Sequence, residues 1–415
     1  MIGVRVDREA VEALSLLSSE AVRTRAHALL ALGLEDRLPH FRIGLDRLDV
    51  AADLVLETTR RAYPSLDVPL HSRWRHFEFQ GEDRWTALAS ARSWRPDEAA
   101  RAAFDLAIVS VLLDAGAGSR WTFHDRRTGA TIGRSEGLAL ATLAMFEDGV
   151  FSGDPRDPLR VDAAVLRTLS AEDIRRGFQT SDANPLVGVE GRINLLRRLG
   201  EVVASQPAIF GRHDSPRPGG LYDVLAARSD ERSIRAPAIL SQLLLHLGSI
   251  WPTRHMLAGI ALGDCWRHPL LRTQDATDGL VPLHKLSQWI AYSLIEPLQW
   301  AGHVVTDIDG LTGLAEYRNG GLFVDTGVLV LRDPAQAMAE HDVGAALVVE
   351  WRALTVALLD ELAGRVRRRL NRDATSFPLG RLLQGGTWAA GRSIAGKLRP
   401  DGSPPIRVIS DGSVF

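Results

Sequence analysis

A helical spacing of large apolar residues is the feature that most constrains what this chain can fold into. Residues three and four positions apart share one helix face, so such a spacing predicts a long amphipathic helix near the C-terminal end. Its apolar stripe consists of Leu347, Trp351, Leu354, Leu358, Leu362 and Val366. The segment from Ala99 to Leu113 is almost wholly apolar and follows Pro96, which is typical of a buried helix. A third helix is expected from Pro282 to Ser293, ending before Pro297.

Strand signals are few, and the best of them lie at Leu322–Leu331 and Ile406–Ile409. Residues 376–415 are rich in glycine and proline, which predicts an irregular C-terminal segment. This segment also contains large apolar residues, so we expect it to fold back on the body of the protein. The sequence therefore predicts one mainly helical domain over residues 1–415, with a small β component.

Composition excludes several classes of function. The chain has 49 basic and 51 acidic residues and a formal net charge of −2, so no overall charge attracts it to nucleic acid or membranes. Cys265 is the single cysteine, which excludes an intrachain disulfide and a cysteine-based zinc cluster. The histidines show no metal-ligand spacing, and the N-terminal residues contain no apolar signal core. We therefore expect a cytoplasmic protein without a metal and without nucleic-acid or membrane partners.

One short motif suggests a serine nucleophile. Gly133, Ser135 and Gly137 match the G-x-S-x-G pattern of a nucleophile elbow, a turn between a strand and a helix. Ala130–Ile132 could form the strand and Leu138–Phe146 the helix. The alternating strands of an α/β hydrolase are missing on both sides, and so short a pattern also arises by chance. A serine hydrolase that uses Ser135 is therefore the less favoured alternative.

The segment His71–Glu78 is dense in arginine, histidine and aromatic residues. Its functional interpretation is a clamp in which Arg73 or Arg75 binds a phosphate and Trp74 stacks on a flat group. His76 would lie beside them. The plainer interpretation is a solvated surface strand or loop, and the residues alone favour neither.

Two later segments carry more chemistry. Helical spacing places Lys285, Gln288 and Tyr292 on one face, where a lysine, an amide and a phenol would form a polar wall. The alternative is an amphipathic helix that exposes its polar side to solvent. Within residues 310–321, Glu316 lies between apolar residues just before a glycine turn, where the backbone can approach a ligand. The alternative there is a surface hairpin with Glu316 in water.

These segments also carry a family resemblance that spans nearly the whole chain. The chain resembles the uracil-catabolism family of the ring-opening pyrimidine route, a domain-of-unknown-function family. The matching stretches are HSRWRHFE at His71–Glu78, GRSEGLALATLAMFEDGVFS at Gly133–Ser152, PLHKLSQWIAYSL at Pro282–Leu294, GLTGLAEYRNGGLFVDTGVL at Gly310–Leu329, GGTWAAGR at Gly385–Arg392 and SDGSVF at Ser410–Phe415. The resemblance implies a role in uracil catabolism.

A more distant similarity implies a fold and a reaction. The order of segments is similar to that of the queuosine 5′-phosphate N-glycosylase family, which has a DNA-glycosylase-like helical fold. That family's Lys-Arg-Ala-Gln helix, Asp-Tyr-Arg motif and Glu-x-Arg-Ala helix match Lys285–Gln288, Glu316–Arg318 and Glu350–Ala353 in order. Glu316 stands where the salvage family has an aspartate, one methylene shorter. Either the reacting carbon lies farther from the backbone here, or the role of the carboxylate has changed.

This similarity implies cleavage of an N-glycosidic bond, which needs a carboxylate close to the anomeric carbon of an oxocarbenium-like state. Glu316 takes that role, and Lys285 or His284 would protonate or hydrogen-bond the leaving nitrogen. Asp278 and Asp309 are the nearest other carboxylates, and Asp278 is also a binding candidate. The remaining substrate-binding candidates are Trp74, His76, Gln288 and Tyr317, with Arg75, Arg134, Arg318 and Arg352 for a 5′-phosphate.

In a ring-opening uracil pathway, the expected substrate is a ribosylurea or its 5′-phosphate, cleaved to urea and the sugar. No metal ion or organic cofactor is implied. The rival from another class is a non-catalytic protein that binds a pyrimidine nucleotide. The phosphorylation state of the sugar and the oligomeric state of the protein stay open at this point.

Overall fold

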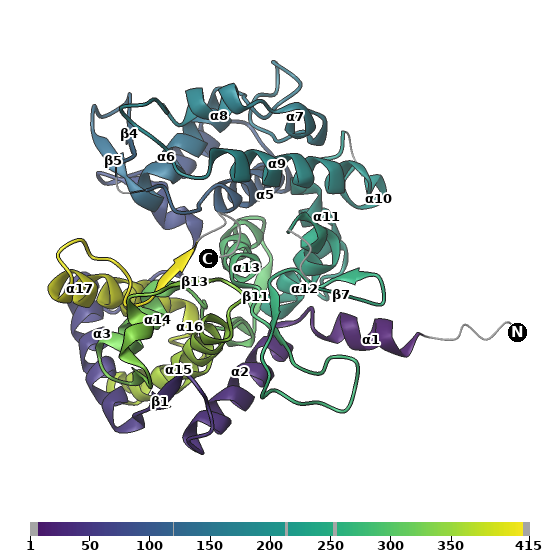
Figure 1. Ribbon diagram of the computed structural model, residues 1–415. Coiled ribbons are helices and arrows are strands. Elements are labelled where there is room, and N and C mark those ends of the chain that lie inside the picture. Colours follow the sequence, from purple (N-terminus) through teal and green to yellow (C-terminus); the bar gives the residue numbers. More distant parts are fainter. Residues whose placement is uncertain (1–6, 119, 212–214, 252–254, 410–415) are drawn as a thin grey trace, which may run out of the picture.

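The structure is a computed structural model that describes residues 7–118, 120–211, 215–251 and 255–409. Helices dominate it (Figure 1), which confirms the mainly helical fold predicted from the apolar spacing. The helices of the first half are α1 (Arg8–Ser15), α2 (Ser19–Leu34), α3 (Leu48–Ala62), α4 (Arg84–Ser90), α5 (Pro96–Leu112), α6 (Arg134–Glu147), α7 (Ala163–Thr168), α8 (Ala171–Gly177), α9 (Val189–Ala204) and α10 (Pro207–Phe210). Those of the second half are α11 (Leu221–Ala227), α12 (Ala236–Leu247), α13 (Lys285–Trp300), α14 (Tyr317–Asp325), α15 (Ala346–Leu370), α16 (Leu379–Leu382) and α17 (Trp388–Leu398).

The strands of the described residues are short and form separate pairs. Antiparallel pairs join β1 (Phe41–Ile43) with β12 (Leu329–Leu331), β2 (Glu78–Phe79) with β3 (Glu82–Asp83), β4 (Thr122–His124) with β5 (Thr131–Gly133), β7 (Met256–Leu257) with β8 (Ile260–Ala261), and β9 (Cys265–Arg267) with β10 (Leu280–Pro282). Parallel pairs join β6 (Ser233–Arg235) with β11 (Val304–Thr306) and β13 (Glu340–Asp342) with β14 (Arg407–Ile409).

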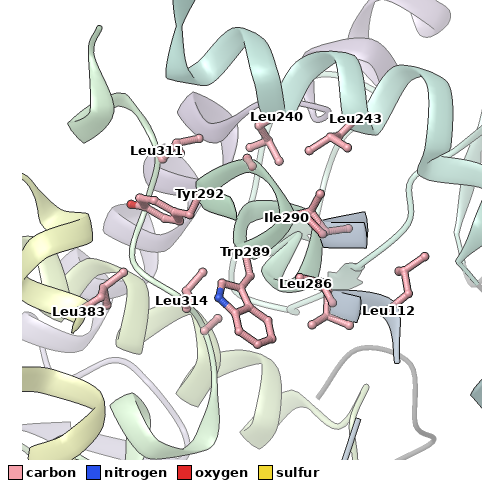
Figure 2. Close-up of a cluster of buried hydrophobic side chains, with 14 of the residues drawn as sticks. Leu112, Leu240, Leu243, Leu286, Trp289, Ile290, Tyr292, Leu311, Leu314 and Leu383 are labelled. Carbon is pink, nitrogen blue, oxygen red and sulfur yellow. The ribbon is translucent and has the colours of Figure 1, made fainter. Parts of the chain in front are cut away.

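Helix α13 lies near the centre of the molecule and packs against α5 and α12 (Figure 1). Figure 2 shows the contact from the inside: Leu286 and Ile290 of α13 lie in one apolar cluster with Leu112 of α5 and with Leu240 and Leu243 of α12. Burial of each such side chain contributes roughly 1.5–3 kcal/mol. Among the described residues, no helix is both long enough and apolar enough to cross a membrane.

Helix α13 runs to Trp300, so the prediction that it ends before Pro297 was wrong. A proline inside a helix leaves the carbonyl four residues earlier without its N–H donor. Here that carbonyl belongs to Ser293, and the indole Nε1 of Trp74 donates to it at 2.7 Å. A side chain from a distant segment therefore replaces the missing backbone donor and allows the helix to continue.

Two further predictions need correction. The expected strand at Leu322–Leu331 is a strand only from Leu329, because residues up to Asp325 belong to α14. The expected glycine turn at residues 319–321 likewise lies inside that helix. There a Cβ on Gly320 would lie 2.7 Å from Nε1 of Trp351, so the glycine permits close packing of α14 on α15.

The C-terminal segment is also more regular than expected. Most of the described part of residues 376–415 consists of α16, a π-helical turn (Leu383–Thr387) and α17, followed by β14. Its glycines lie where neighbours come close: a Cβ on Gly391 would collide with the carbonyl oxygen of Arg318, and one on Gly386 with Val55. Phe377, Leu379, Leu382, Leu383, Ala390 and Ile406 join the main apolar core. The matching stretch Ser410–Phe415 lies outside the described residues.

Candidate functional site

A pocket of 590 Å³ opens between the first turn of α13, the N-terminal ends of α6 and α14, and the C-terminal segment. Its wall includes residues 114–118 after α5, residues 134–136 and 138 of α6 and residues 316–318. Trp388 of α17 and residues 401–404, 406 and 408 also line it. In Figure 1 the C-terminal strand β14 runs from the α17 side of the molecule towards the region between α6 and α13. The volume is that of a nucleotide-sized ligand pocket.

Lys285 and Glu316 both line this pocket. Lys285 is the first residue of α13, and Glu316 precedes the first residue of α14. The Glu316 carboxylate caps α14, because one oxygen accepts the backbone N–H of Arg318 at 2.8 Å and the other that of Asn319 at 2.6 Å. Aspartate is the common acidic N-cap. The longer glutamate caps this helix with its carboxylate at the pocket wall.

Burial shifts both groups towards their neutral forms. Burial raises the pKa of Glu316, although the backbone N–H groups of Arg318 and Asn319 and the charge of Lys285 oppose this rise. Burial also lowers the pKa of Lys285, with Glu316 acting against this change. Carboxylates and amines with shifted pKa values in a pocket are candidates for proton transfer and for electrostatic stabilisation.

A buried ion pair fixes the two helix ends that carry Lys285 and Glu316. Arg352 of α15 donates to both oxygens of Asp264, at 2.9 Å and 2.8 Å. Asp264 Oδ2 also accepts the backbone N–H of Lys285 at 2.9 Å, and Arg352 Nε donates to the carbonyl of Ala315 at 3.3 Å. The Asp264–Arg352 pair thus links the first residue of α13 to the residue just before Glu316.

Gln288 and Tyr292 add a second link between the same two segments. The Gln288 amide donates to Thr312 Oγ1 and accepts the Thr312 backbone N–H at 3.1 Å. The Tyr292 hydroxyl donates to the Thr312 carbonyl at 3.1 Å. Neither side chain lines the pocket, so the predicted polar wall of Lys285, Gln288 and Tyr292 was wrong in this respect. Only Lys285 faces the pocket, while the other two hold the chain that leads to Glu316.

Arginine side chains gather at another part of the pocket. Arg134 and Arg318 line it, and the Arg318 guanidinium lies 5.0 Å from the Tyr317 ring and 5.1 Å from the Trp388 ring. Arg392 lies 5.6 Å from the same Trp388 ring. Burial lowers the pKa of Arg392, Glu136 opposes this effect, and Arg134 and Arg318 reinforce it, so these cations lie close to one another. The region has an excess of positive charge that suits an anionic group.

His76 also lines the pocket, as an uncharged ring. Its Nδ1 lies 3.1 Å from Nη1 of Arg73. Because an arginine can only donate, Nδ1 accepts and the proton of the neutral ring belongs on Nε2. Burial lowers the pKa of His76 well below its ordinary value, and the charge of Arg73 lowers it further.

Several predicted site residues lie elsewhere. Trp74 is buried and donates to Ser293, so it does not stack on a ligand. Arg75 pairs with Glu78 and Glu296 and does not line the pocket. Arg352 is occupied by Asp264 and is unsuited to binding a phosphate.

Three further candidates lie outside the pocket as well. Asp278 accepts from Arg272 and from the backbone N–H of Thr273. Asp309 pairs with Arg367. The His284 ring lies 3.0 Å from the carbonyl of Leu16, and burial lowers its pKa, which favours a neutral ring that donates to this carbonyl.

The serine-hydrolase alternative lacks its base. The strand and helix around Ser135 are present as β5 and α6, and Ser135 lines the pocket. Its hydroxyl donates to Asp114 at 3.1 Å, and no histidine among the described residues hydrogen-bonds to it. The left-handed backbone of the motif falls on Arg134, with φ of 61°, and not on the serine. This geometry disfavours a nucleophile elbow.

Sequence reasoning missed Asp114, a carboxylate that lines the pocket directly after α5. It pairs with the buried Arg73 at 3.2 Å. No motif marks it, since the apolar helix before it gives no sign of where the chain turns next. Trp289 of α13 also lines the pocket. Among the described residues, no group of histidine, cysteine, aspartate and glutamate side chains is arranged to hold a metal ion.

Comparison with known proteins places the chain in a family. Residues 15–415 match the family model described as "Protein of unknown function (DUF1688)". "Protein urg3" of Schizosaccharomyces pombe is 38% identical over 411 residues, which cover 96% of this chain and 98% of that protein. "Uracil catabolism protein 4" of Lachancea kluyveri is 38% identical over 414 residues, which cover 91% of this chain and 92% of that protein. The chain belongs to this family.

Proposed function

We propose that the protein is an N-glycosidase of uracil catabolism that cleaves a ribosylurea, or its 5′-phosphate, to urea and the sugar. The name of the Lachancea kluyveri relative supports the pathway. The observation that carries the reaction is the position of Glu316, a buried carboxylate fixed at the pocket wall by two backbone N–H groups, with Lys285 in the same pocket.

Glu316 would act on the sugar. Cleavage of the glycosidic bond develops positive charge at the anomeric carbon, and a fixed anion stabilises that charge without reorganising during the reaction. The two backbone N–H groups orient the carboxylate and disperse part of its charge, while each oxygen keeps a second lone pair for the ligand or for a water molecule. An electrostatic or general-base role fits this geometry better than a mobile nucleophile.

Lys285 would act on the leaving group. Its ammonium can donate a proton or a hydrogen bond to the departing nitrogen, and its lowered pKa makes it a better proton donor than an exposed lysine. At the other part of the pocket, Arg134 and Arg318, with Arg392 beside them, provide cations for a 5′-phosphate. The substrate would then lie with its sugar between the arginines and Glu316.

The test is urea release from ribosylurea 5′-phosphate, and from ribosylurea, by purified protein without added metal. For Glu316→Gln we expect turnover to fall about 100-fold or more, because the variant lacks the charge that stabilises the transition state. KM should change little, since the substrate carries no positive charge at that carbon before reaction. Glu316→Asp keeps the charge but shortens the reach, so it should be impaired less than Glu316→Gln.

The cap on α14 requires its own control. Glutamine has one acceptor oxygen, so Glu316→Gln loses one of the two backbone bonds, at a cost of roughly 1 kcal/mol of stability. Asp83 caps α4 away from the pocket by accepting one backbone N–H, that of Thr86, so Asp83→Ala should show a comparable loss in melting temperature with normal turnover. Near-normal urea release by Glu316→Gln would exclude this carboxylate as the catalyst. Ligand binding without urea release by the wild type would support the binding-protein alternative.

A further inference from the structure

Three buried polar atoms beside the pocket have no hydrogen-bond partner among the described residues: Asp114 Oδ1, Arg73 Nη2 and Trp289 Nε1. Their side chains are nearly inaccessible to solvent, with exposures of 4% for Asp114, 0% for Arg73 and 6% for Trp289. A buried polar atom without a partner is costly, and native proteins contain few of them. Asp114 and Trp289 line the pocket, so a ligand there could satisfy their unpartnered atoms.

Arg73 contacts both of the other side chains. Arg73 Nη1 lies 3.2 Å from Asp114 Oδ2, and the Arg73 guanidinium lies 5.5 Å from the Trp289 ring. The hydroxyl of Ser135 occupies the same Oδ2 at 3.1 Å, which leaves Oδ1 as the free oxygen. Asp114 and Trp289 both line the pocket. The wall formed by Asp114 and Trp289, with Arg73 paired to Asp114, therefore offers the pocket one acceptor and one donor.

We propose that this wall binds an amide edge of the substrate, meaning an N–H group next to a C=O group. The N–H would donate to Asp114 Oδ1, and the C=O would accept from Trp289 Nε1. Small rotations about the terminal torsions of Asp114 and Trp289 bring these atoms to a ligand, since such torsions are broad. Carboxamides, ureides and imides all carry this edge, whereas a sugar hydroxyl or a phosphate does not.

The wall is next to the proposed reaction centre. Trp289 follows Lys285 by one helical turn on α13, so both side chains point to the same side of the helix. The leaving group would lie between Trp289 and Lys285, on the nitrogen side of the bond that Glu316 is proposed to act on. This assignment rests on the proposed function only for the identity of the leaving group, because the complementarity of the edge does not depend on catalysis.

Binding of analogues that cannot be hydrolysed tests the wall without turnover. The first probe is the carbocyclic analogue of ribosylurea 5′-phosphate, whose ring oxygen is replaced by CH₂. The second probe is the same carbocyclic phosphate with hydrogen in place of the ureido group. Uridine 5′-phosphate is the third, with an imide edge on a planar ring. We expect the wild type to bind the ureido probe at least about 10-fold more tightly than the truncated probe in calorimetry.

Two variants test whether the tighter binding of the ureido probe depends on Asp114 and Trp289. Asp114→Asn should weaken binding of the ureido probe by roughly 10-fold to 100-fold and leave the truncated probe unchanged. Trp289→Phe keeps the ring but removes the N–H group, and it should weaken the ureido probe by about 10-fold. Asp114→Asn weakens the pairing of Arg73. If that variant fails to fold, Trp289→Phe alone tests whether the wall binds the ureido group. Trp94→Phe is the control, because Trp94 is partly buried outside the pocket, and both affinities should stay at wild-type values.

Equal wild-type affinity for the ureido and truncated probes would overturn the wall's assignment, as would equal weakening of both probes in the two variants. Tighter binding of uridine 5′-phosphate with the same dependence on Asp114 would support the amide edge and identify an imide ring as its source. Asp114-dependent binding of the ureido probe together with no urea release by the wild type would support the wall while contradicting the glycosidase.

Discussion

Two of the pairs of opposite charge in the pocket region, Asp264–Arg352 and Lys285–Glu316, differ in how they are satisfied. In the Asp264–Arg352 pair, two short bonds join the groups, and Asp264 also accepts from the backbone of Lys285. In the Lys285–Glu316 pair, the carboxylate bonds to backbone N–H groups, and the Lys285 ammonium has no hydrogen bond or ion pair within the described residues. The first pair is closed to a ligand and the second remains open to one.

The difference shows that neighbouring charged residues can have different tasks: one pair fixes the positions of the helix ends, and the other is available to a ligand. A bidentate ion pair with additional backbone bonds has little capacity left for a substrate, so it fixes the positions of its neighbours. A lysine and a carboxylate that share a pocket without bonding to each other keep their lone pairs and protons for a ligand. Because Asp264 and Arg352 bond directly to the chain at Lys285 and Ala315, the closed pair positions the open one.

The largest effect should come from opening the closed pair. Asp264→Ala leaves Arg352 charged, buried and without this partner, and it removes an acceptor from the start of α13. We expect a loss of about 3–5 kcal/mol in the free energy of unfolding, measured with denaturant. Asp278→Asn, at a surface carboxylate outside the pocket, should change it by no more than about 0.5 kcal/mol. A loss below about 1 kcal/mol for Asp264→Ala would show that the Asp264–Arg352 pair does not fix the start of α13 and the chain before Glu316.

This stability should also depend on pH. Burial opposes the ionisation of Asp264, but Arg352, Trp266 and the backbone of Lys285 outweigh it and lower the pKa from 3.8 to about 2. A lowered pKa in the folded state means that the ionised group contributes stability in full above pH 3.8 and loses it as the pH falls towards 2. The difference between the wild type and Asp264→Ala should therefore shrink within that window.

The open pair predicts an intermediate effect, on the pH profile of urea release. Because the pKa of Glu316 is raised, the rate should fall on the acid side at a pH above the ordinary range of a carboxylate. Because the pKa of Lys285 is lowered, the rate should fall on the alkaline side below the ordinary range of a lysine. The result is a bell-shaped profile of kcat/KM with both limbs shifted towards neutrality. Limbs at the ordinary values would contradict the buried environment assigned to both groups.

The smallest effect should come from Tyr292→Phe, which removes one bond to the Thr312 carbonyl. Gln288 still holds Thr312 through two hydrogen bonds. We expect a loss of about 1 kcal/mol in unfolding free energy and a turnover close to that of the wild type. A 10-fold fall in turnover would instead mean that the phenol, and not the amide, sets the position of Glu316.

The sequence predicted the helices well because their apolar spacing is a local property. The helix over residues 346–370 and the buried helix α5 both follow their predicted stripes. The arginines show the opposite case. Arg352 is held by Asp264, and Arg75 is held by Glu296 as well as by the nearby Glu78, while Arg134 and Arg318 line the pocket. The sequence around an arginine does not record a carboxylate partner from a distant segment, such as Glu296 for Arg75 or Asp264 for Arg352, so the phosphate candidates could not be separated before the fold was known.

The prediction of an irregular C-terminal segment, made from its glycines, was wrong for a related reason. Glycine disfavours helices in isolation, so a glycine-rich stretch predicts irregular structure. Here Gly386 and Gly391 lie at helical contacts that a Cβ would block. The favourable packing of α17 on α14 outweighs the local preference, and packing is visible only when both partners are in place.

The order of the pocket-lining segments along the chain has a consequence for biosynthesis. Asp114 is made early, Lys285 and Glu316 follow much later, and residues 401–408 come near the end. Domains begin to fold from the N-terminal side while translation continues. A nascent chain can therefore assemble much of its helical core while the pocket-lining residues after α17 are still inside the ribosome. A chain that stops before residue 401 contains the residues of α1 to α17 but lacks the pocket-lining residues that follow α17.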